Sequence, residues 1–270
     1  MIRFGVTLPS GQRKWLGEEG HKVIFASGFD SVTELATSAC ANGVGVNIEG
    51  DSKPSRIMQL KIVPSGNDAE DGRYKLFNLM PSGTERRFLI RTDTENYYIY
   101  ATVTAFEVSP FSEQVQKQIV TVTLTATNPL FYLFTPESQT KTISATSPAV
   151  FSCNNDGEAT GFKLTVKTNT TSSNSMMNPI VKLGSDTLKF ILNISTGGSL
   201  IINTVKGSKS AKLTYSAAGG TVVSDVIPKR ADGSTFIQLP ARSVSKLTVN
   251  VEGTGAGTVT LNYRQCFDFI

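Results

Sequence analysis

The 270-residue chain is poor in histidine, the side chain that most often acts as a general acid or base, and its only one is His21. A Ser-His-Asp or Cys-His triad needs an imidazole next to a nucleophile, and the chain contains no nucleophile elbow of the G-x-S-x-G type. His21 follows Glu18 and Glu19 in a loop-like region, so we expect it to be solvated. We therefore expect no enzyme activity, no catalytic residue and no bound cofactor.

Cysteine is also scarce, and Cys40, Cys153 and Cys266 lie far apart without a C-x-x-C pair. An odd number of separated thiols argues against a disulfide framework and against a thiolate metal site. We expect three buried thiols in a protein made in a reducing compartment.

Long apolar runs are missing as well. No stretch approaches the roughly 18 apolar residues of a membrane span, and the opening "MIRFGVTLPSGQRK" has no apolar core of a secretory signal. We expect no membrane insertion.

The formal net charge of +4 is unevenly distributed, but no dense basic run occurs. Residues 1–135 carry 13 lysines and arginines against 14 acids, whereas residues 136–270 carry 13 against 8. Duplex recognition needs a clustered basic stripe, so specific binding of nucleic acid is not expected.

What the chain has in abundance is two-residue alternation, which is typical of half-buried strands. In "IVTVTLTATNPLFYLF" (119–134), every second residue from Val120 to Ala126 is apolar, and "RIMQLKIV" (56–63) alternates in the same way. Further strands are expected at 86–92 and 97–108, joined by the turn "DTEN". Eight short strands are expected in the second half: "GFKLTVKT", "NPIVKLG", "LKFILNIS", "GSLIINTV", "AKLTYSA", "STFIQLPA", "SKLTVNVEG" and "GTVTLNYRQCF". They predict a jelly-roll β-sandwich.

One helix is expected, near 67–80. Asn67 and Glu70 have the spacing of a capping box, and Tyr74, Phe77 and Met80 form an apolar stripe. The predicted organisation is an N-terminal β domain at 1–135, a linker at 136–149 rich in Ser, Thr and Pro, and a C-terminal domain at 150–270. A return of the last residues to the first domain is left open.

Tyrosines cluster at 97–100. Because consecutive strand residues point to opposite faces, Tyr98 and Tyr100 share one face and Tyr97 lies on the other. One face is expected in the core, and the other is either core or a contact surface, since tyrosine is favoured at interfaces.

The order of elements resembles the distal tail proteins of siphophages. The resemblance rests on "SRIMQLKIV", the helix "GRYKLFNLM", "RRFLIRTDTENYYIYATVTAFEV", "QKQIVTVTLTATNPLFY" and a jelly-roll half that opens with "NNDGEATGFKLTV". It covers residues 56–267 and implies an all-β fold with one short helix. The N-terminal part would be a ring-forming β-sandwich with an extended hairpin, and the C-terminal part a galectin-like jelly roll.

The resemblance also implies a structural protein of the virion. Six copies would form a ring that joins the tail tube to tail-tip or baseplate proteins, including a tail-associated fibre or lysin. DNA would pass through the central channel without being bound specifically. The protein would be located at the tail tip after assembly in the cytoplasm of the bacterial host. Residues 97–108 and 117–127 would form a hairpin that reaches a neighbouring subunit, with Tyr98, Tyr100, Gln116 and Gln118 as candidates for the oligomer interface.

Two other functions stay open. A carbohydrate-binding adhesion module contacting the host surface would need an exposed aromatic platform, but most aromatic residues of the second half occupy core-like positions. A hydrolase of cell-wall polymer would need a catalytic constellation that the residue inventory does not supply.

Overall fold

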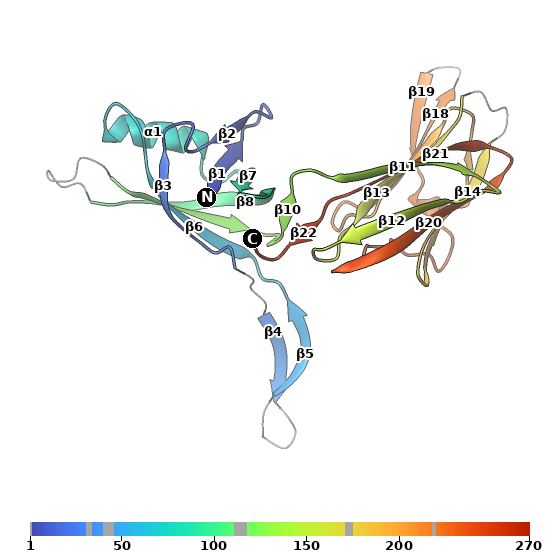
Figure 1. The fold of residues 1–270 in the computed structure, drawn as a ribbon, viewed down its shortest axis with the longest axis horizontal. Coiled ribbons are helices and arrows are strands. Elements are labelled where there is room, and N and C mark those ends of the chain that lie inside the picture. The colour runs from blue at the N-terminus through green and yellow to red at the C-terminus, as the bar shows by residue number, and fades with distance from the viewer. Residues whose placement is uncertain (1, 31–33, 40–45, 111–117, 171–174, 218–219) are drawn as a thin grey trace. The chain divides into compact units, whose positions relative to one another are not determined.

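The structure is a computed structural model that describes residues 2–30, 34–39, 46–110, 118–170, 175–217 and 220–270. The chain folds as two compact units, and the second unit is inserted into the first. Unit 1 consists of Met1–Phe134 and Phe267–Ile270, and unit 2 of Thr135–Cys266. The described residues are almost entirely antiparallel β-structure with one α-helix, which confirms the predicted fold class (Figure 1). The described part of the chain contains no helix with the length and hydropathy of a membrane span.

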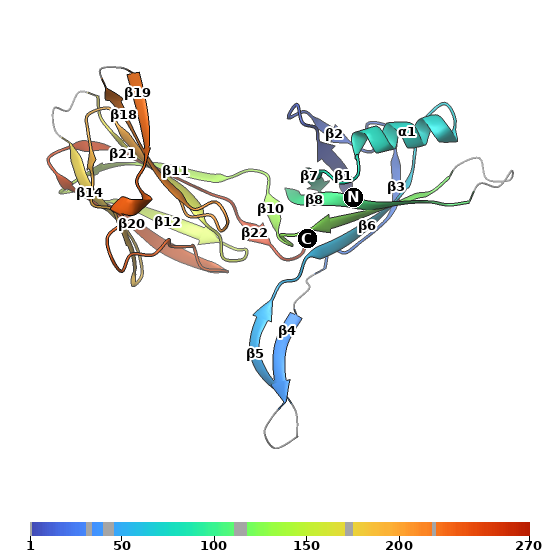
Figure 2. The ribbon, with the colours of Figure 1, turned by 180° about the vertical axis from the view of Figure 1, so that it is seen from behind.

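Unit 1 is built on a nine-stranded antiparallel sheet whose central path runs β2-β1-β7-β8-β9-β6-β3 (Figures 1 and 2). Strand β10 pairs with β8, and β22 pairs with β10. Strands β4 and β5 form a two-stranded sheet of their own. The strands are β1 (Arg3–Thr7), β2 (Arg13–Trp15), β3 (Lys22–Ser27), β4 (Glu34–Ala39), β5 (Val46–Ser52), β6 (Arg56–Val63), β7 (Glu85–Arg91), β8 (Asn96–Val108), β9 (Val120–Ala126), β10 (Phe131–Leu133) and β22 (Cys266–Phe267).

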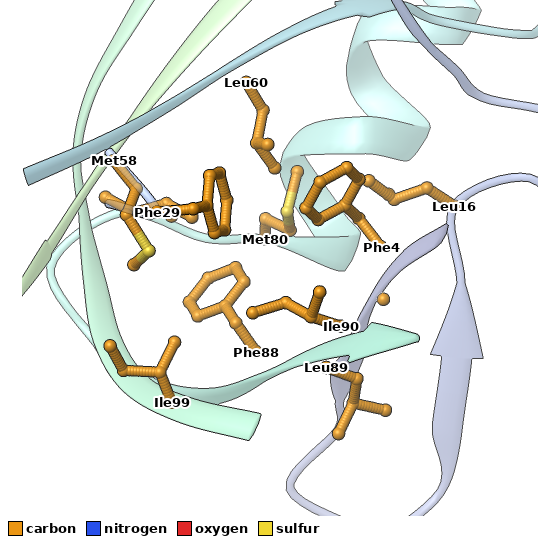
Figure 3. Close-up of a pocket in the computed structure, with 12 residues that line it drawn as sticks. Phe4, Leu16, Phe29, Met58, Leu60, Met80, Phe88, Leu89, Ile90 and Ile99 are labelled. Atoms are coloured by element: carbon orange, nitrogen blue, oxygen red, sulfur yellow. The ribbon is translucent and has the colours of Figure 1, made fainter. Parts of the chain in front are cut away.

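The alternating sequences produce one buried face, as predicted. In β9 and β6 every second residue is buried, and Val122 lies opposite Leu60 in the register of these strands. These residues join β1, β7 and β8 in one apolar core. Figure 3 shows Phe88 and Ile90 pointing into this core, with Leu89 on the other side of β7. The remaining cavity of about 10 Å³ has room for roughly one water molecule, so it is not a ligand pocket.

The predicted helix exists as α1 (Ala69–Leu79), but two details differ. The N-cap is Asp68, not Asn67, because the Asp68 carboxylate accepts a hydrogen bond from the Asp71 amide. The buried positions are Gly72, Leu76 and Leu79, while Tyr74 is exposed. The helix therefore packs on a face rotated from the predicted stripe, although Met80 just beyond it is buried.

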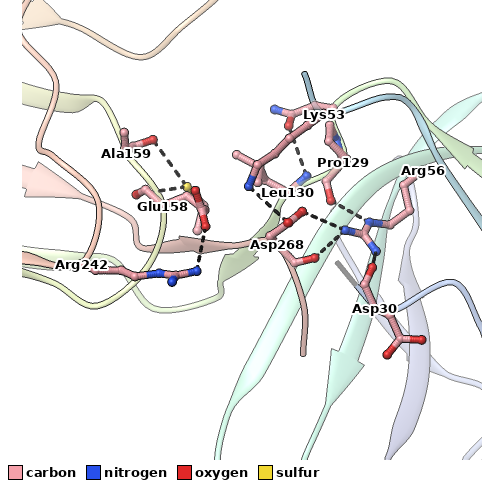
Figure 4. A network of polar contacts seen from close by, with 11 residues as sticks. Asp30, Lys53, Arg56, Pro129, Leu130, Glu158, Ala159, Arg242 and Asp268 are labelled. Atoms are coloured by element: carbon pink, nitrogen blue, oxygen red, sulfur yellow. Dashed lines mark hydrogen bonds and ion pairs between the residues drawn. The ribbon is translucent and has the colours of Figure 1, made fainter. Parts of the chain in front are cut away.

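Arg56, the first residue of β6, fastens the C-terminal tail to unit 1 (Figure 4). Its buried guanidinium donates hydrogen bonds to the carbonyl oxygen of Pro129 (2.8 Å) and to the carbonyl oxygen and carboxylate of Asp268 (2.5 and 3.2 Å). It also donates to the carbonyl oxygens of Gly28 (2.9 Å) and Asp30 (2.5 Å). One side chain thus holds together segments that are more than 200 residues apart in the sequence.

Unit 2 is a β-sandwich. One sheet has the order β11-β21-β13-β17-β18-β19, the other runs β12-β20-β14-β15 with β16 paired to β14, and residues of both sheets share one apolar core. The strands are β11 (Glu137–Ser144), β12 (Ala149–Asn155), β13 (Phe162–Thr168), β14 (Met176–Leu183), β15 (Asp186–Lys189), β16 (Asn193–Ile194), β17 (Ser199–Asn203), β18 (Ser210–Ala217), β19 (Gly220–Asp225), β20 (Ser243–Gly253) and β21 (Ala256–Tyr263), and a 3-10 helix η1 spans Ile227–Lys229.

Two predictions for this part are wrong. Residues 137–144, assigned to the linker, form β11, which pairs with β21 along its whole length. The segment 234–241, predicted as a strand, is irregular and contributes only an isolated bridge between Leu239 and Thr160. In both places the presence of a partner strand decides the outcome. Residues 137–144 are polar but form a strand because they hydrogen-bond to β21, whereas residues 234–241 are more apolar but have no strand to pair with.

The thiols agree with the sequence-based expectation where they are described. Cys153 and Cys266 are buried and are not joined in a disulfide. Burial raises the pKa of the Cys153 thiol to about 11, so it is neutral and unreactive. Cys40 lies outside the described residues.

Candidate functional site

The strongest candidate site is the outer face of the unit 1 sheet, opposite the core. Across strands β2, β1, β7, β8 and β10, the register aligns Trp15, Gly5, Leu89, Tyr98 and Tyr132 in one row. Directly opposite residues of an antiparallel sheet share a face, so this row is continuous across five strands. We call the face the aromatic–arginine surface; its members are Arg3, Arg13, Trp15, Arg87, Leu89, Arg91, Tyr98, Tyr100, Tyr132 and Phe134.

A glycine makes the row possible. A β-carbon at Gly5 would lie 2.6 Å from the Lys14 carbonyl oxygen and 2.9 Å from Cε3 of Trp15, closer than non-bonded carbon atoms approach. The backbone of β1 is thereby left open for the indole ring of Trp15. Gly5 thus serves close packing on this face.

Aromatic rings stack along the surface. The ring centroids of Tyr98 lie 5.5 Å from Tyr132, 5.6 Å from Tyr100 and 6.1 Å from Phe134, which are stacked and edge-on geometries. The Asn128 amide donates a hydrogen bond to the Tyr132 hydroxyl at 2.8 Å, which fixes the end of the row. The cluster is therefore held in place before any partner arrives.

Arginine side chains cover these rings. The Arg87 guanidinium carbon lies 4.7 Å from the Tyr98 ring centroid and 5.5 Å from that of Tyr100, and its Nη2 donates to the Tyr100 hydroxyl at 2.9 Å. The Arg13 guanidinium carbon lies 3.7 Å from the Phe134 ring. These are cation–π geometries. Four arginines give the surface a positive character, and Glu85 lies at its margin in β7.

A cleft of about 360 Å³ opens at one side of the surface. Its lining includes Trp15 and Arg3 together with Ile2, Leu16 and Val23. Charged side chains of both signs also line it, namely Arg3, Lys22 and Glu18. A cleft with aromatic and aliphatic walls can accept a protruding side chain of a partner protein.

The predicted interface residues do not all lie together in the structure. Tyr98 and Tyr100 lie side by side on the aromatic–arginine surface, Tyr98 nearly buried and Tyr100 39% exposed. Tyr97 points to the other face, as predicted, and packs edge-on against Phe267. Gln118 is buried elsewhere, where its side-chain oxygen accepts a hydrogen bond from Arg73 and its amide donates to the Ser109 carbonyl. Gln116 lies outside the described residues.

Sequence reasoning did not find the rest of the surface. Arg13 and Trp15 come from the short strand β2, which is not among the predicted strands. Tyr132 lies in the three-residue strand β10, and Phe134 follows directly after that strand. The alternation of Arg87, Leu89 and Arg91 was a usable signal, because it places two arginines on the face that Tyr98 shares.

The structure corrects the expected exposure of His21. Its side chain is 2% exposed, and its Nδ1 accepts a hydrogen bond from the Ser65 amide at 3.0 Å. The His21 side chain therefore stabilises the segment that precedes α1 through this hydrogen bond. In the part of the chain that the structure describes, no three His, Cys, Asp or Glu side chains gather as metal ligands would.

This burial predicts a loss of stability in acid. Desolvation lowers the pKa of His21 below 6.5, with Glu19 opposing the shift and Lys75 adding to it. Below about pH 6.5, His21 binds a proton in the unfolded chain but stays neutral in the folded chain. The free energy of unfolding is therefore highest above about pH 6.5 and falls as the pH drops through that value. The Ser65 hydrogen bond is lost on protonation at Nδ1.

The check is the urea midpoint of unfolding at pH 8 and pH 5.5, compared with His21→Asn, whose amide oxygen can replace Nδ1 without titrating. The wild type is expected to lose more stability between the two pH values than the variant. Equal losses would contradict a folded-state role for the neutral imidazole.

No protein-family model matches the chain, and a search of curated proteins gives no match either. Solved structures do match. The crystal structure of the SPP1 Dit (gp 19.1) protein, described as a paradigm of the hub adsorption apparatus in phages infecting Gram-positive bacteria, aligns over 99% of both chains with a TM-score of 0.70 and 16% identity. The chain has a Dit-like fold.

Two further structures support the Dit-like fold. They are chains of the phage p2 baseplate in its activated conformation, with Sr and with Ca, which align over 100% of both chains at TM-scores of 0.56 and 0.53 and identities of 10% and 9%. The predicted resemblance to siphophage distal tail proteins is confirmed at the level of the fold. The Dit-like fold includes both units, so the inserted sandwich belongs to the shared architecture.

Proposed function

We propose that this chain is a structural hub protein of a phage tail. Six copies form a ring at the tail tip that joins the tail tube to the baseplate or tail-tip proteins, including a tail-associated fibre or lysin. The observation that carries the proposal is the full-length similarity to the SPP1 hub protein, over 99% of both chains. The ring assembles in the cytoplasm of the bacterial host and stays in the virion.

Neighbouring subunits meet through the aromatic–arginine surface. Tyrosine, tryptophan and arginine are the residues most enriched at energetically important contacts, and here they are already ordered by one another. A cyclic ring needs a head-to-tail contact between two different surfaces. The exposed start of α1, with Asp68 and Glu70, offers the next subunit's arginines a surface of opposite charge.

Unit 1 suits the wall of a channel for DNA. It carries 13 lysines and arginines against 15 aspartates and glutamates. A strongly basic wall would hold phosphates through counterion release, whereas a nearly neutral one lets the duplex slide. DNA therefore passes through the ring without specific binding.

Immunogold labelling of phage particles that contain the chain tests its location. Gold is expected at the distal end of the tail, where tube and tip proteins meet. Labelling along the tube or on the capsid, or purified tails that lack the chain, would overturn the proposal.

A further inference from the structure

Unit 2 has a polar, cationic sheet face that the hub function does not use. In the six-stranded sheet, the inward-facing residues of β13, Leu164 and Val166, belong to the core, so their neighbours Lys163, Thr165 and Lys167 face outward. The register extends these outward positions across the sheet as three rows. They are Ser138-Asn262-Lys163-Asn203-Ser210, Thr140-Thr260-Thr165-Ile201-Lys212 and Thr142-Thr258-Lys167-Ser199-Thr214, which we call the lysine–hydroxyl face.

The side chains of this face are almost all polar or positively charged. Of its 15 positions, one is aliphatic, none is aromatic and none is acidic. The row that contains Lys212 continues onto the edge strand β19 with an acid, Asp225, directly opposite Lys212. The hydroxyls of Thr140 and Thr260 lie 2.9 Å apart, which shows that the two side chains project from the same face.

The three lysines are available to an external anion. Among the described residues no ion pair or side-chain hydrogen bond involves Lys163, Lys167 or Lys212, and each is exposed. Lys163 and Lys167 are separated by about 13 Å along β13, and Lys212 lies two strands away, about 10 Å to the side. Ammonium groups so spaced do not converge on one phosphate; they match successive charges along a polymer.

The unit as a whole has the charge needed to attract such a polymer. Unit 2 carries 13 lysines and arginines against 7 aspartates and glutamates, in contrast to the nearly neutral unit 1. A field of one sign concentrates anionic partners and raises their association rate.

The side chains between the lysines distinguish two kinds of polyanion. Single-stranded nucleic acid is bound by stacking its bases on aromatic side chains, and the lysine–hydroxyl face has none. Threonine, serine and asparagine side chains instead donate and accept hydrogen bonds in the way that sugar or polyol hydroxyls do. We propose that the lysine–hydroxyl face binds a phosphate-bearing glycan or polyol polymer, of the kind that an adsorption protein would meet at a cell surface.

The test uses the full chain and polyglycerol phosphate as the probe, with binding measured by isothermal titration calorimetry at 50 and 200 mM salt. The triple variant K163Q/K167Q/K212Q is expected to bind at least ten-fold more weakly and to have a shallower salt dependence. The matched control K182Q/K189Q/K246Q removes the same charge from the other sheet and is expected to stay within two-fold of the wild type. Uncharged dextran and oligo(dT) serve as competing probes.

Three results would overturn the proposal. They are the absence of binding by the wild type at 50 mM salt, equal weakening by the two triple variants, and binding of oligo(dT) at least as tight as that of polyglycerol phosphate. The second result would assign the binding to net charge, and the third to a nucleic-acid surface. The assembly state of the chain does not enter any of these outcomes, so the hub proposal and this one can fail separately.

Discussion

Arg56→Met is expected to lower the free energy of unfolding of unit 1 by about 3–5 kcal/mol. The guanidinium donates to four carbonyl oxygens and one carboxylate, and its carbon atom lies 4.7 Å from the Phe131 ring. Its loss removes one hydrogen-bond donor from each of these acceptors. The Asp268 carboxylate, which is 4% exposed, also loses its ion pair with Arg56, and Lys53 at 3.3 Å remains beside it as a cation. Removing one partner of a buried ion pair lowers the free energy of unfolding by more than the intact pair contributes, because the other charge stays buried without compensation.

The measurement is urea unfolding followed by the fluorescence of Trp15, the single tryptophan, which reports on unit 1 alone. Arg56→Lys keeps the charge but loses the planar guanidinium with its several N–H donors. Its free energy of unfolding should lie between those of the wild type and Arg56→Met. Lys75→Met is the matched control, because it removes an exposed pair with Asp71 and should cost less than about 0.5 kcal/mol. A loss below 1 kcal/mol for Arg56→Met would show that the network does not hold the tail.

The double variant Tyr100→Ala with Arg87→Ala is expected to dissociate the proposed ring. Both side chains lie on the aromatic–arginine surface, and removing a hot-spot aromatic–arginine pair costs about 2 kcal/mol or more of contact energy. In the proposed ring each subunit has two neighbours, so the loss of contact energy is repeated at every contact. Sedimentation velocity should show a shift to single chains at concentrations where the wild type is assembled.

The control for this prediction is a second aromatic–cation pair on unit 1. Phe25 is 47% exposed, and Lys61 lies 5.3 Å from its ring. The variant Phe25→Ala with Lys61→Ala removes comparable groups outside the proposed contact and should leave assembly unchanged. If it dissociates the ring as much as the first variant, or if neither variant does, the aromatic–arginine surface is not the contact.

Strands whose partners lie close in sequence, or whose apolar alternation is long, could be predicted from the sequence. Val120, Val122 and Leu124 alternate with threonines, and period two alone identifies the buried face of β9. The predicted strand at 97–108 differs from β8 by a single residue at its start. Helix α1 could be predicted from its acidic first turn, although its N-cap is Asp68, one residue after the predicted Asn67.

Elements that depend on distant partners could not be predicted. Strand β11 reads as a polar, linker-like segment, and it forms because β21, more than 100 residues later, offers it a full ladder. The register between β2, β1, β7, β8 and β10 assembles the aromatic–arginine surface from segments that share no local pattern. His21 looked solvated because its acceptor role depends on the Ser65 amide, 44 residues away.

The mass of the purified chain in solution, measured by light scattering during size-exclusion chromatography, tests the central claim most directly. A hub built by edge and face contacts of unit 1 predicts particles of six times the 29.0 kDa mass of one chain, visible as closed rings in negative stain. Single chains at high concentration, with no ring on mixing with tail-tube protein, would contradict the account.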